Sequence, residues 1–217
     1  MKTNHWYKTY SDNQHLSSWP WSEVISLCNR FCKKKINNKN SKLLELGFGA
    51  GANIPFFLKQ KIKYYGVEGS KNIVNVVKKK YKNKNLIHGD FSQSYFEKYK
   101  FDVILDRASI THNNKKDIHR ILDDVQDKLI KKGIFIGIDW YSKNCSDFIN
   151  RKSKNNYLYF KSGVFKNIGG VFFSNKKDIL NFFKKFKIIH LSEKKIETFR
   201  KKKKYIVSSW SIVAEKK

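Results

Sequence analysis

The sequence predicts an α/β fold, a doubly wound sheet of parallel strands covered by helices. Short apolar runs alternate with segments of helical periodicity from about residue 42 to about residue 140, a pattern typical of repeated strand–helix–strand units. The expected strands are 42–46, 63–67, 85–88, 101–106 and 133–139, and the expected helices between them are 52–60, 71–81 and 114–130. With 40% hydrophobic and 15% aromatic residues the chain can build a core, which excludes an extended disordered chain.

The helix expected at 114–130 shows the clearest periodicity. Its apolar residues recur three or four positions apart, so that they share one face that a sheet can bury. These residues are Ile118, Ile121, Leu122, Val125 and Leu129. Asn113 or Asn114 is available as the N-cap, because an Asn side chain can accept from a free backbone N–H of the first turn.

A further helix is expected before the sheet, with Pro20 in its first turn. Its apolar face consists of Trp21, Val24, Ile25, Cys28, Phe31 and Cys32. The spacing of Cys28 and Cys32 would suit a metal pair, but a structural zinc site needs about four ligands and no companion Cys or His cluster follows. We therefore expect both thiols to pack in the core and expect no metal. Three cysteines are also too few for a disulfide framework.

The pattern changes after residue 140. Residues 141–172 are polar and aromatic with several glycines, and indicate an irregular insertion or cap over the sheet. The elements expected after it are a short helix that Ser174 caps and that ends at Phe183, then strand-like runs at 187–191 and 205–214 around a basic turn at 200–204. We expect a single domain over 1–217, in which 1–40 form an N-terminal arm and helix.

The chain is strongly basic, with 46 lysine and arginine residues against 18 aspartate and glutamate residues and a formal net charge of +28. Such a charge suits nucleic-acid binding, because basic side chains release counterions from a phosphate backbone. The excess is lysine spread through every segment, however, and only five residues are arginine, so we favour a compositional bias. No apolar run approaches the roughly 20 residues that span a bilayer. The N-terminus lacks the apolar core of a secretion signal, so we expect a cytoplasmic protein.

The segment 43–53, Leu-Leu-Glu-Leu-Gly-Phe-Gly-Ala-Gly-Ala-Asn, is the most informative part of the sequence. A buried strand runs into a glycine-rich turn and then a helix, which lets the backbone approach a ligand at the carboxyl end of the sheet. Gly47, Gly49 and Gly51 lie in this turn. Glycines alone are a weak signal, since a tight strand-to-helix turn without a ligand has the same pattern.

Acidic residues stand at the ends of the next strands. Glu68 lies 21 residues after Gly47, near the spacing at which an acid meets a ribose diol. Asp90 and Phe91 follow the third strand, where a carboxylate can accept from an adenine amino group and a ring can line its face. Asp106 ends the fourth strand. Because acids at three successive strand ends follow a glycine turn, the sequence predicts a nucleoside site.

With these motifs the sequence resembles the class I S-adenosylmethionine-dependent methyltransferases. The resemblance covers about residues 42–140 and rests on the segments 45–51, 67–68, 89–91, 101–106 and 128–134. It implies a seven-stranded, mostly parallel sheet with an antiparallel C-terminal strand, and S-adenosylmethionine as cofactor with S-adenosylhomocysteine as product. The residues that it assigns to the cofactor are Gly47, Gly49 and Gly51 for the methionine part, Glu68 with Gly69 for the ribose, and Asp90 with Phe91 for the adenine.

The charge of the cofactor also favours this assignment over a dinucleotide. A dinucleotide brings a pyrophosphate to a helix N-terminus, whereas the amino-acid end of S-adenosylmethionine carries an ammonium group. Glu45, just before the glycines, and Asp106 would attract that ammonium group. We therefore count both among the expected cofactor-binding residues.

Methyl transfer from a sulfonium is an in-line displacement, so we expect the protein mainly to position the acceptor and to exclude water. A base helps when the acceptor is a hydroxyl or an ammonium group. His112 is the candidate base, although a histidine there can instead cap the next helix or bind the loop. Arg107 is a candidate to bind an acceptor phosphate or carboxylate, unless it pairs with Asp106 or Asp139. The expected catalytic residues are His112, Asp106 and Arg107.

Two segments are expected to bind the methyl acceptor. The end of the fifth strand faces the same crevice, and the aromatic N-terminal segment is expected to close over it as a lid, unless it only packs on the sheet. The expected acceptor-binding residues are Trp6, Tyr7, Tyr10, Arg107, Asp139, Trp140 and Tyr141.

The expected reaction is methylation of N or O of a small polar metabolite, with a sugar or a sugar nucleotide as a candidate. The chain shows no added RNA-binding domain, and its fourth strand does not end in a motif of the Asn-Pro-Pro-Tyr type. An anionic acceptor would suit the positive field. The alternative is an RNA or protein methyltransferase that docks its substrate on the basic surface. The sequence leaves the acceptor, the choice between N and O, and the oligomeric state open.

Overall fold

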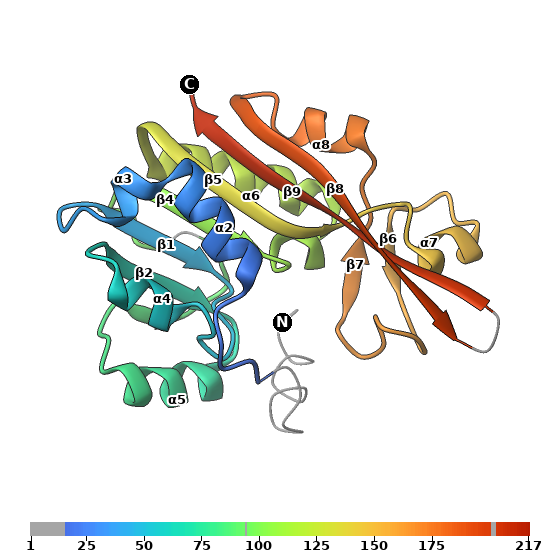
Figure 1. Cartoon of the computed structure of the whole chain (residues 1–217), viewed down its shortest axis with the longest axis horizontal. Helices are drawn as coiled ribbons and strands as arrows, with labels where there is room; N and C mark the ends of the chain where they lie inside the picture. The colour runs from blue at the N-terminus through green and yellow to red at the C-terminus, as the bar shows by residue number, and fades with distance from the viewer. Residues whose placement is uncertain (1–15, 94, 201–202) are drawn as a thin grey trace.

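The computed structural model describes residues 16–93, 95–200 and 203–217, and its centre is a seven-stranded sheet (Figure 1). The strand order is β3-β2-β1-β4-β5-β9-β8. The strands are β1 (Lys42–Leu46), β2 (Lys63–Glu68), β3 (Leu86–His88), β4 (Phe101–Arg107), β5 (Leu129–Tyr141), β8 (Phe186–Arg200) and β9 (Lys203–Lys216). The first five run parallel, and β9 is antiparallel to both of its neighbours. The expected mostly parallel sheet with an antiparallel C-terminal strand is confirmed.

The strand order reverses between β1 and β4. The chain builds β2 and β3 outward on one side of β1, then returns to place β4 and β5 on the other side. Leu46 at the end of β1 pairs with Asp106 in β4. In doubly wound sheets ligands bind at this switch point, outside the carboxyl ends of the strands. The loops after β1 and β4 therefore flank the place where a ligand is expected.

Helices cover both faces of the sheet (Figure 1). They are α2 (Ser22–Phe31), α3 (Lys33–Ile36), α4 (Ile54–Lys59), α5 (Lys71–Tyr81), the 3-10 turn η1 (Ile110–His112), α6 (Lys115–Lys128), α7 (Ser146–Arg151) and α8 (Lys176–Phe182). One core cluster joins the sheet to α2, α4 and α5 through residues such as Val24 and Phe57. The other joins it to α6 and α8 through residues such as Ile118 and Phe182. Each face of the sheet therefore has its own core.

Several expected elements are confirmed where the sequence pattern was strong. Helix α5 has the expected bounds, and α6 begins after Asn114, whose side chain accepts from the backbone N–H of Asp117. Cys28 and Cys32 are buried in the core cluster beneath α2. Burial keeps these thiols protonated and raises the pKa of Cys32 to about 12.

The helix after the insertion has a different cap from the one expected. Asn175, not Ser174, caps α8: its side chain accepts from the backbone N–H of Asp178, and the Asp178 carboxylate accepts from the N–H of Asn175. This reciprocal capping box satisfies two backbone donors at once. Ser174 instead lies one position earlier, with its backbone carbonyl accepting from the Trp210 indole.

Residues 141–172 are more regular than the irregular cap that the sequence predicts. They contain α7 and an antiparallel pair of short strands, β6 (Tyr157–Tyr159) and β7 (Gly170–Phe172). A separate cluster of apolar side chains fills this insertion. The long β8–β9 hairpin continues beyond the main sheet alongside it (Figure 1), and Ser146 accepts from the backbone N–H of Ile206. The division of 1–217 into one domain with an arm and an inserted cap stays a prediction.

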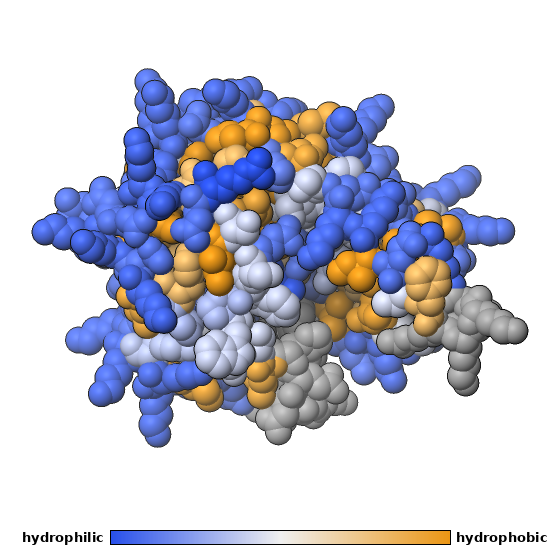
Figure 2. Space-filling view, viewed as in Figure 1, coloured by the Kyte–Doolittle hydropathy of each residue, from blue (hydrophilic) through white to orange (hydrophobic). Residues whose placement is uncertain are grey.

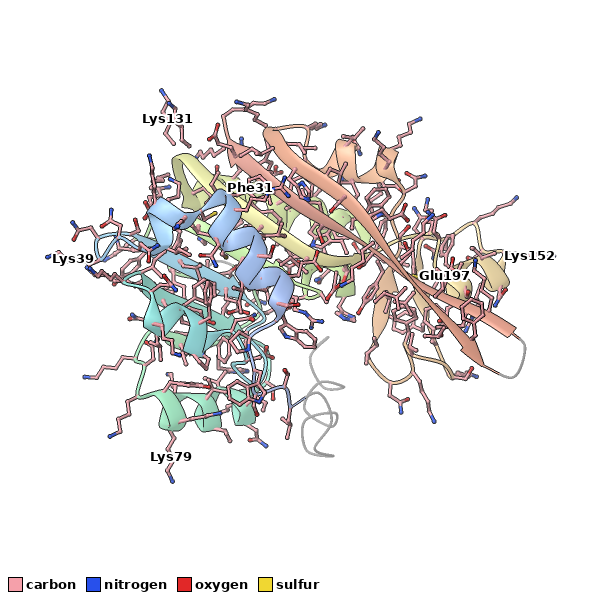
Figure 3. All side chains as sticks on the ribbon, in the orientation of Figure 1. Phe31, Lys39, Lys79, Lys131, Lys152 and Glu197 are labelled. Carbon is pink, nitrogen blue, oxygen red and sulfur yellow. The ribbon has the colours of Figure 1, made fainter. Side chains whose placement is uncertain are left out.

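The surface is dominated by charged side chains. Figure 2 shows hydrophilic residues extending from much of the visible face, with apolar residues between them. Lys39, Lys79, Lys131 and Lys152 extend from well-separated parts of the fold (Figure 3). Within the described ranges, no helix is long and apolar enough to cross a membrane.

Candidate cofactor and acceptor site

A cavity of about 320 Å³ opens at the carboxyl ends of β1, β2 and β4. Small-molecule sites commonly have volumes of roughly 300–1,000 Å³, so this cavity has the size of a ligand site. Of the expected catalytic and binding residues, those that line it are Glu45, Gly47, Gly49, Glu68, Gly69, Asp90, Phe91, Arg107, His112 and Tyr141. Trp6, Tyr7 and Tyr10 lie outside the described residues.

The glycine turn after β1 forms one wall of the cavity. Gly47 and Gly49 have positive φ angles of 66° and 52°, which glycine adopts without strain. A Cβ atom added to Gly47 would lie 2.2 Å from the Oγ of Ser109, so no larger residue fits between the turn and the loop after β4. The close approach leaves backbone atoms of the turn exposed to the cavity.

Gly51 has a packing role that the sequence pattern did not distinguish from ligand binding. It also has a positive φ, of 78°, but it does not line the cavity. An added Cβ would lie 2.9 Å from Val77 and 3.2 Å from Tyr81 in α5. Gly51 therefore lets the turn pack against α5, and its expected contact with the cofactor stays a prediction.

Glu68 holds the turn from the end of β2. Its two carboxylate oxygens accept from the backbone N–H groups of Gly49 and Ser70, each at 3.0 Å. Burial raises the pKa of Glu68, while these backbone hydrogen bonds lower it. Because each carboxylate oxygen has two acceptor positions, Glu68 keeps capacity to accept from a diol.

Asp90 and Phe91 form the wall after β3. Asp90 accepts from the backbone N–H of Ser92 at 2.8 Å, and the half-buried Phe91 ring packs against the main core. Both line the cavity next to Gly69 and Gly89. The Asp90 carboxylate, a hydrogen-bond acceptor, therefore lies near the Phe91 ring at this end of the cavity. This pair suits a flat base that carries an amino group.

Glu45 belongs to a buried hydrogen-bond network beneath the cavity. Its carboxylate accepts from the Asn53 amide at 2.8 Å and from the Tyr64 hydroxyl at 2.5 Å. Burial raises the pKa of Glu45 to about 7, although the hydrogen bonds from Tyr64 and Asn53 oppose the shift. Asn53 in turn accepts from the backbone N–H of Trp21, which ties the start of α2 to the glycine turn.

Asp106 and Trp140 do not line the cavity but support the loop after β4, which does. Asp106 is fully buried and accepts from the backbone N–H groups of Ser109 and Ile110 at 3.1 and 3.0 Å. Its other oxygen accepts from the Trp140 indole N–H at 2.7 Å. Burial raises the pKa of Asp106 to about 7. Both residues therefore hold the loop after β4, and their expected roles toward the ligands stay predictions.

Arg107 pairs with Asp139, one of the two alternatives that the sequence left open. The Arg107 Nη2 atom lies 2.7 Å from the Asp139 carboxylate, and the guanidinium carbon lies 3.4 Å from the Trp21 ring centroid. Asp139 also accepts from the Ser209 hydroxyl at 3.1 Å, and it does not line the cavity. Arg107 therefore reaches the cavity with its charge balanced and one face covered by an aromatic ring.

His112 lines the cavity from η1. Its Nδ1 atom is 3.0 Å from the carbonyl oxygen of Gly170 in β7. A carbonyl oxygen can only accept, so Nδ1 carries a proton, and the lone pair of the neutral ring is on Nε2. The backbone carbonyl of His112 accepts from the Tyr157 hydroxyl at 3.1 Å.

Some lining residues carried no local sequence signal. Trp21 was expected to pack, Asn53 was only the end of the glycine segment, and Ser109 meets Gly47 through the fold. Ile168 reaches the cavity from the insertion. Among the parts of the chain that the structure describes, no group of three or more His, Cys, Asp or Glu side chains could hold a metal ion.

The fold is that of the Rossmann-like methyltransferases, and the cavity lies at the switch point where such sheets bind their ligands. Residues 44–137, which span β1 to β5, match the family model described as a methyltransferase domain. This match agrees with the resemblance to the class I S-adenosylmethionine-dependent methyltransferases that the sequence motifs carry. No curated protein matches the sequence.

Solved structures of similar fold are distant in sequence. A protein from Pyrococcus horikoshii aligns with a TM-score of 0.70 at 17% identity, covering 99% of each chain. A methyltransferase from Methanosarcina mazei has a TM-score of 0.69 at 13% identity, covering 91% of this chain and 98% of its own. Magnesium protoporphyrin IX methyltransferase from Synechocystis, solved with S-adenosylhomocysteine, has a TM-score of 0.61 at 13% identity. The alignment covers 90% of this chain and 81% of that protein. At these identities the likeness concerns the fold.

The cofactor of this class fits the residues present. Gly47 leaves no room for a side chain and so keeps backbone atoms at the cavity wall. Glu68 retains acceptor positions for hydroxyl groups, and Asp90 with Phe91 offers an acceptor and a ring. Glu45 also lines the cavity, and its ionised form would attract a cation.

Proposed function

We propose that the chain methylates N or O of a small polar metabolite, with a sugar or a sugar nucleotide as a candidate acceptor. One observation carries this proposal. His112, Arg107 and Tyr141 line the same cavity of about 320 Å³ as Glu68 and Gly47. The donor site and a set of polar acceptor-side groups therefore share one space of small-molecule size.

The proposed cofactor contacts follow the cavity wall. Glu68 with Gly69 binds the ribose hydroxyls, Asp90 with Phe91 binds the adenine, and backbone atoms of the glycine turn approach the methionine part. S-adenosylmethionine supplies an electrophilic methyl group that a nucleophile displaces in line. The protein contributes by holding donor and acceptor in that geometry and by excluding water.

His112 is the proposed general base. Because Nδ1 donates to the Gly170 carbonyl, Nε2 is the ring nitrogen that would take a proton from the hydroxyl or ammonium group of the methyl acceptor. Arg107 is the proposed binding group for an acceptor anion. The Asp139 partner and the Trp21 ring hold the guanidinium in place while its remaining N–H groups stay available.

An RNA or protein acceptor is the second candidate. It would use the basic surface for docking, but the four lysines labelled in Figure 3 extend in different directions from well-separated parts of the fold. The cytoplasmic location and the contribution of Trp6, Tyr7 and Tyr10 as a lid also stay predictions. Removing residues 1–16 tests the lid, because unchanged cofactor affinity and turnover would exclude it.

The experiment is incubation of the full chain with isotope-labelled S-adenosylmethionine and a fractionated metabolite extract, followed by mass analysis of the labelled product. We expect label in a small polar compound. His112→Gln should abolish most turnover while S-adenosylhomocysteine binding is retained, and His119→Gln on the outer helix α6 is the matched control. Label that appears only in added RNA or protein would contradict the small-molecule assignment.

A further inference from the structure

The insertion contacts His112 from two directions. The Gly170 carbonyl in β7 accepts from Nδ1 of the ring at 3.0 Å. The Tyr157 hydroxyl in β6 donates to the backbone carbonyl of His112 at 3.1 Å. One contact orients the ring and the other orients the backbone of η1, so the two short strands of the insertion hold the residue at both ends.

Tyr157 and Gly170 depend on each other. Tyr157 pairs with Phe172 across the β6–β7 ladder, which places Gly170 diagonally beside Tyr157 on the same face. A Cβ atom at position 170 would lie 2.2 Å from Cζ and 2.3 Å from the hydroxyl oxygen of Tyr157. The phenol can therefore cross the strand and reach His112 only because residue 170 is glycine.

The insertion is also fixed relative to the sheet. Most of its apolar side chains form their own cluster, but Phe172 belongs to the main core and contacts Phe182 of α8 with ring centroids 5.6 Å apart. The neighbouring Ile168 lines the cavity. The β6–β7 pair therefore connects the main core to the part of the cavity where we propose that the methyl acceptor binds.

We propose that Tyr157 and Gly170 are positioning residues that fix the ring orientation and the Nδ1–H tautomer of His112. This proposal rests on the proposed function, in which His112 is the base. A proton that leaves the acceptor goes to Nε2, and the imidazolium keeps its Nδ1–H bond to the Gly170 carbonyl. The insertion is thus part of the catalytic machinery and not only a cover over the sheet.

The test uses the full chain labelled with ¹⁵N in its histidines, with His112 assigned by comparison with His112→Gln. In the wild type we expect the neutral ring to show a protonated Nδ1 and an unprotonated Nε2. Tyr157→Phe removes only the hydroxyl, and it should mix the two tautomers. It should also lower kcat about fivefold, the equivalent of roughly 1 kcal/mol for one hydrogen bond, without changing the KM for S-adenosylmethionine.

Tyr99→Phe is the control, because Tyr99 lies outside the insertion, is 41% exposed and has its ring 5.3 Å from that of Tyr65. It should leave the tautomer and kcat unchanged. Gly170→Ala should have a larger effect than Tyr157→Phe, since it displaces the phenol. If Gly170→Ala does not fold, Tyr157→Phe still decides the question.

An unchanged His112 tautomer in Tyr157→Phe, or a wild-type ring with Nε2 protonated, would overturn the positioning role. Failure of the proposed function gives a different result. In that case His112→Gln would turn over at the wild-type rate, while the wild-type ring would still show the Nδ1–H tautomer that Tyr157→Phe loses.

Discussion

Three buried carboxylates at the strand ends differ in what their oxygens bind. Glu68 accepts from two backbone N–H groups and also lines the cavity. Asp106 has both oxygens engaged by the loop after β4 and by the Trp140 indole, and it has no cavity face. Glu45 sits between Tyr64 and Asn53. Exposure to the cavity, more than the presence of an acid, therefore decides which carboxylate can meet a ligand.

The raised pKa of Glu45 predicts a pH dependence of stability. Burial raises its pKa to about 7 in the folded chain, whereas the unfolded chain keeps an ordinary value near 4.5. Between these values the folded state binds more protons, so this group makes the free energy of unfolding fall as pH rises, by about 1 kcal/mol per pH unit. The stability of Glu45→Gln should lack this contribution.

The measurement is urea unfolding of both proteins from pH 5 to pH 7.5. The wild type should lose stability relative to Glu45→Gln as pH rises through this range. The difference between the two proteins isolates Glu45 from all other titrating groups. A difference that stays constant, or that grows in favour of the wild type at higher pH, would contradict the raised pKa.

The contact between Gly47 and Ser109 predicts a steric double-mutant effect. Gly47→Ala forces an L side chain to a positive φ and places its Cβ against the Ser109 hydroxyl, so it should lower stability by about 1–3 kcal/mol and weaken cofactor binding. Adding Ser109→Gly removes the overlap and should restore part of the loss. Thermal unfolding and calorimetric titration with S-adenosylhomocysteine measure both effects; additive losses would contradict the contact.

At the scale of elements, the insertion shows how short pieces acquire order from their neighbours. Its helix α7 has six residues, and β6 and β7 have three residues each. Helices and strands this short have only marginal stability on their own. The cluster around Phe165 and Phe173 and the contact of α7 with the β8–β9 hairpin supply the missing stabilisation.

The capping box of α8 predicts a measurable contribution of one element end. Asn175→Ala removes the side-chain oxygen that accepts from the N–H of Asp178 and keeps the backbone N–H that donates to the Asp178 carboxylate, so it should lower the free energy of unfolding by about 1 kcal/mol. Lys177→Ala, at an exposed position of the same helix, is the control and should change stability little. Chemical denaturation of both variants is the measurement, and equal stabilities would exclude Asn175 as the cap.

The sequence predicted those elements whose signal is local. The helical spacing of Ile118, Leu122 and Val125 predicted α6. The glycine turn followed by Glu68 predicted the side of the cavity where the methyl donor is expected. It did not predict that Gly51 packs on α5, because the same positive φ serves a turn and a ligand site. Nor did it predict the contacts of His112 with Gly170 and Tyr157, since residues far apart in the chain meet only after the insertion folds.

For the whole molecule, strand order determines where the chemistry can occur. The reversal between β1 and β4 brings the glycine turn, Glu68 and the loop that carries Arg107 and His112 to one edge of the sheet. The formal charge of +28 is in contrast spread around the fold, as the labelled lysines in Figure 3 illustrate. The site and the charge are therefore separate properties of the molecule.

This separation predicts how salt affects binding. Association with a single-stranded RNA homopolymer should weaken steeply between 50 and 200 mM salt, on the order of 10³-fold for six phosphate contacts. The affinity for S-adenosylhomocysteine should change far less, because its contacts lie in the cavity. Fluorescence titrations of both ligands at the two salt concentrations make the comparison. A cofactor affinity that follows the RNA affinity would show that the cavity depends on the basic surface.

Calorimetric titration of S-adenosylhomocysteine into the full chain, into Glu68→Ala and into Glu197→Ala tests the central claim most directly. Glu197 lies on the β8–β9 hairpin, where it pairs with Lys204, and serves as the matched control. We expect one site per chain, an affinity at least tenfold weaker in Glu68→Ala because charged hydrogen bonds contribute about 1.5–3 kcal/mol, and no change in Glu197→Ala. Equal affinities in all three proteins would contradict a donor site at the carboxyl ends of β1 and β2.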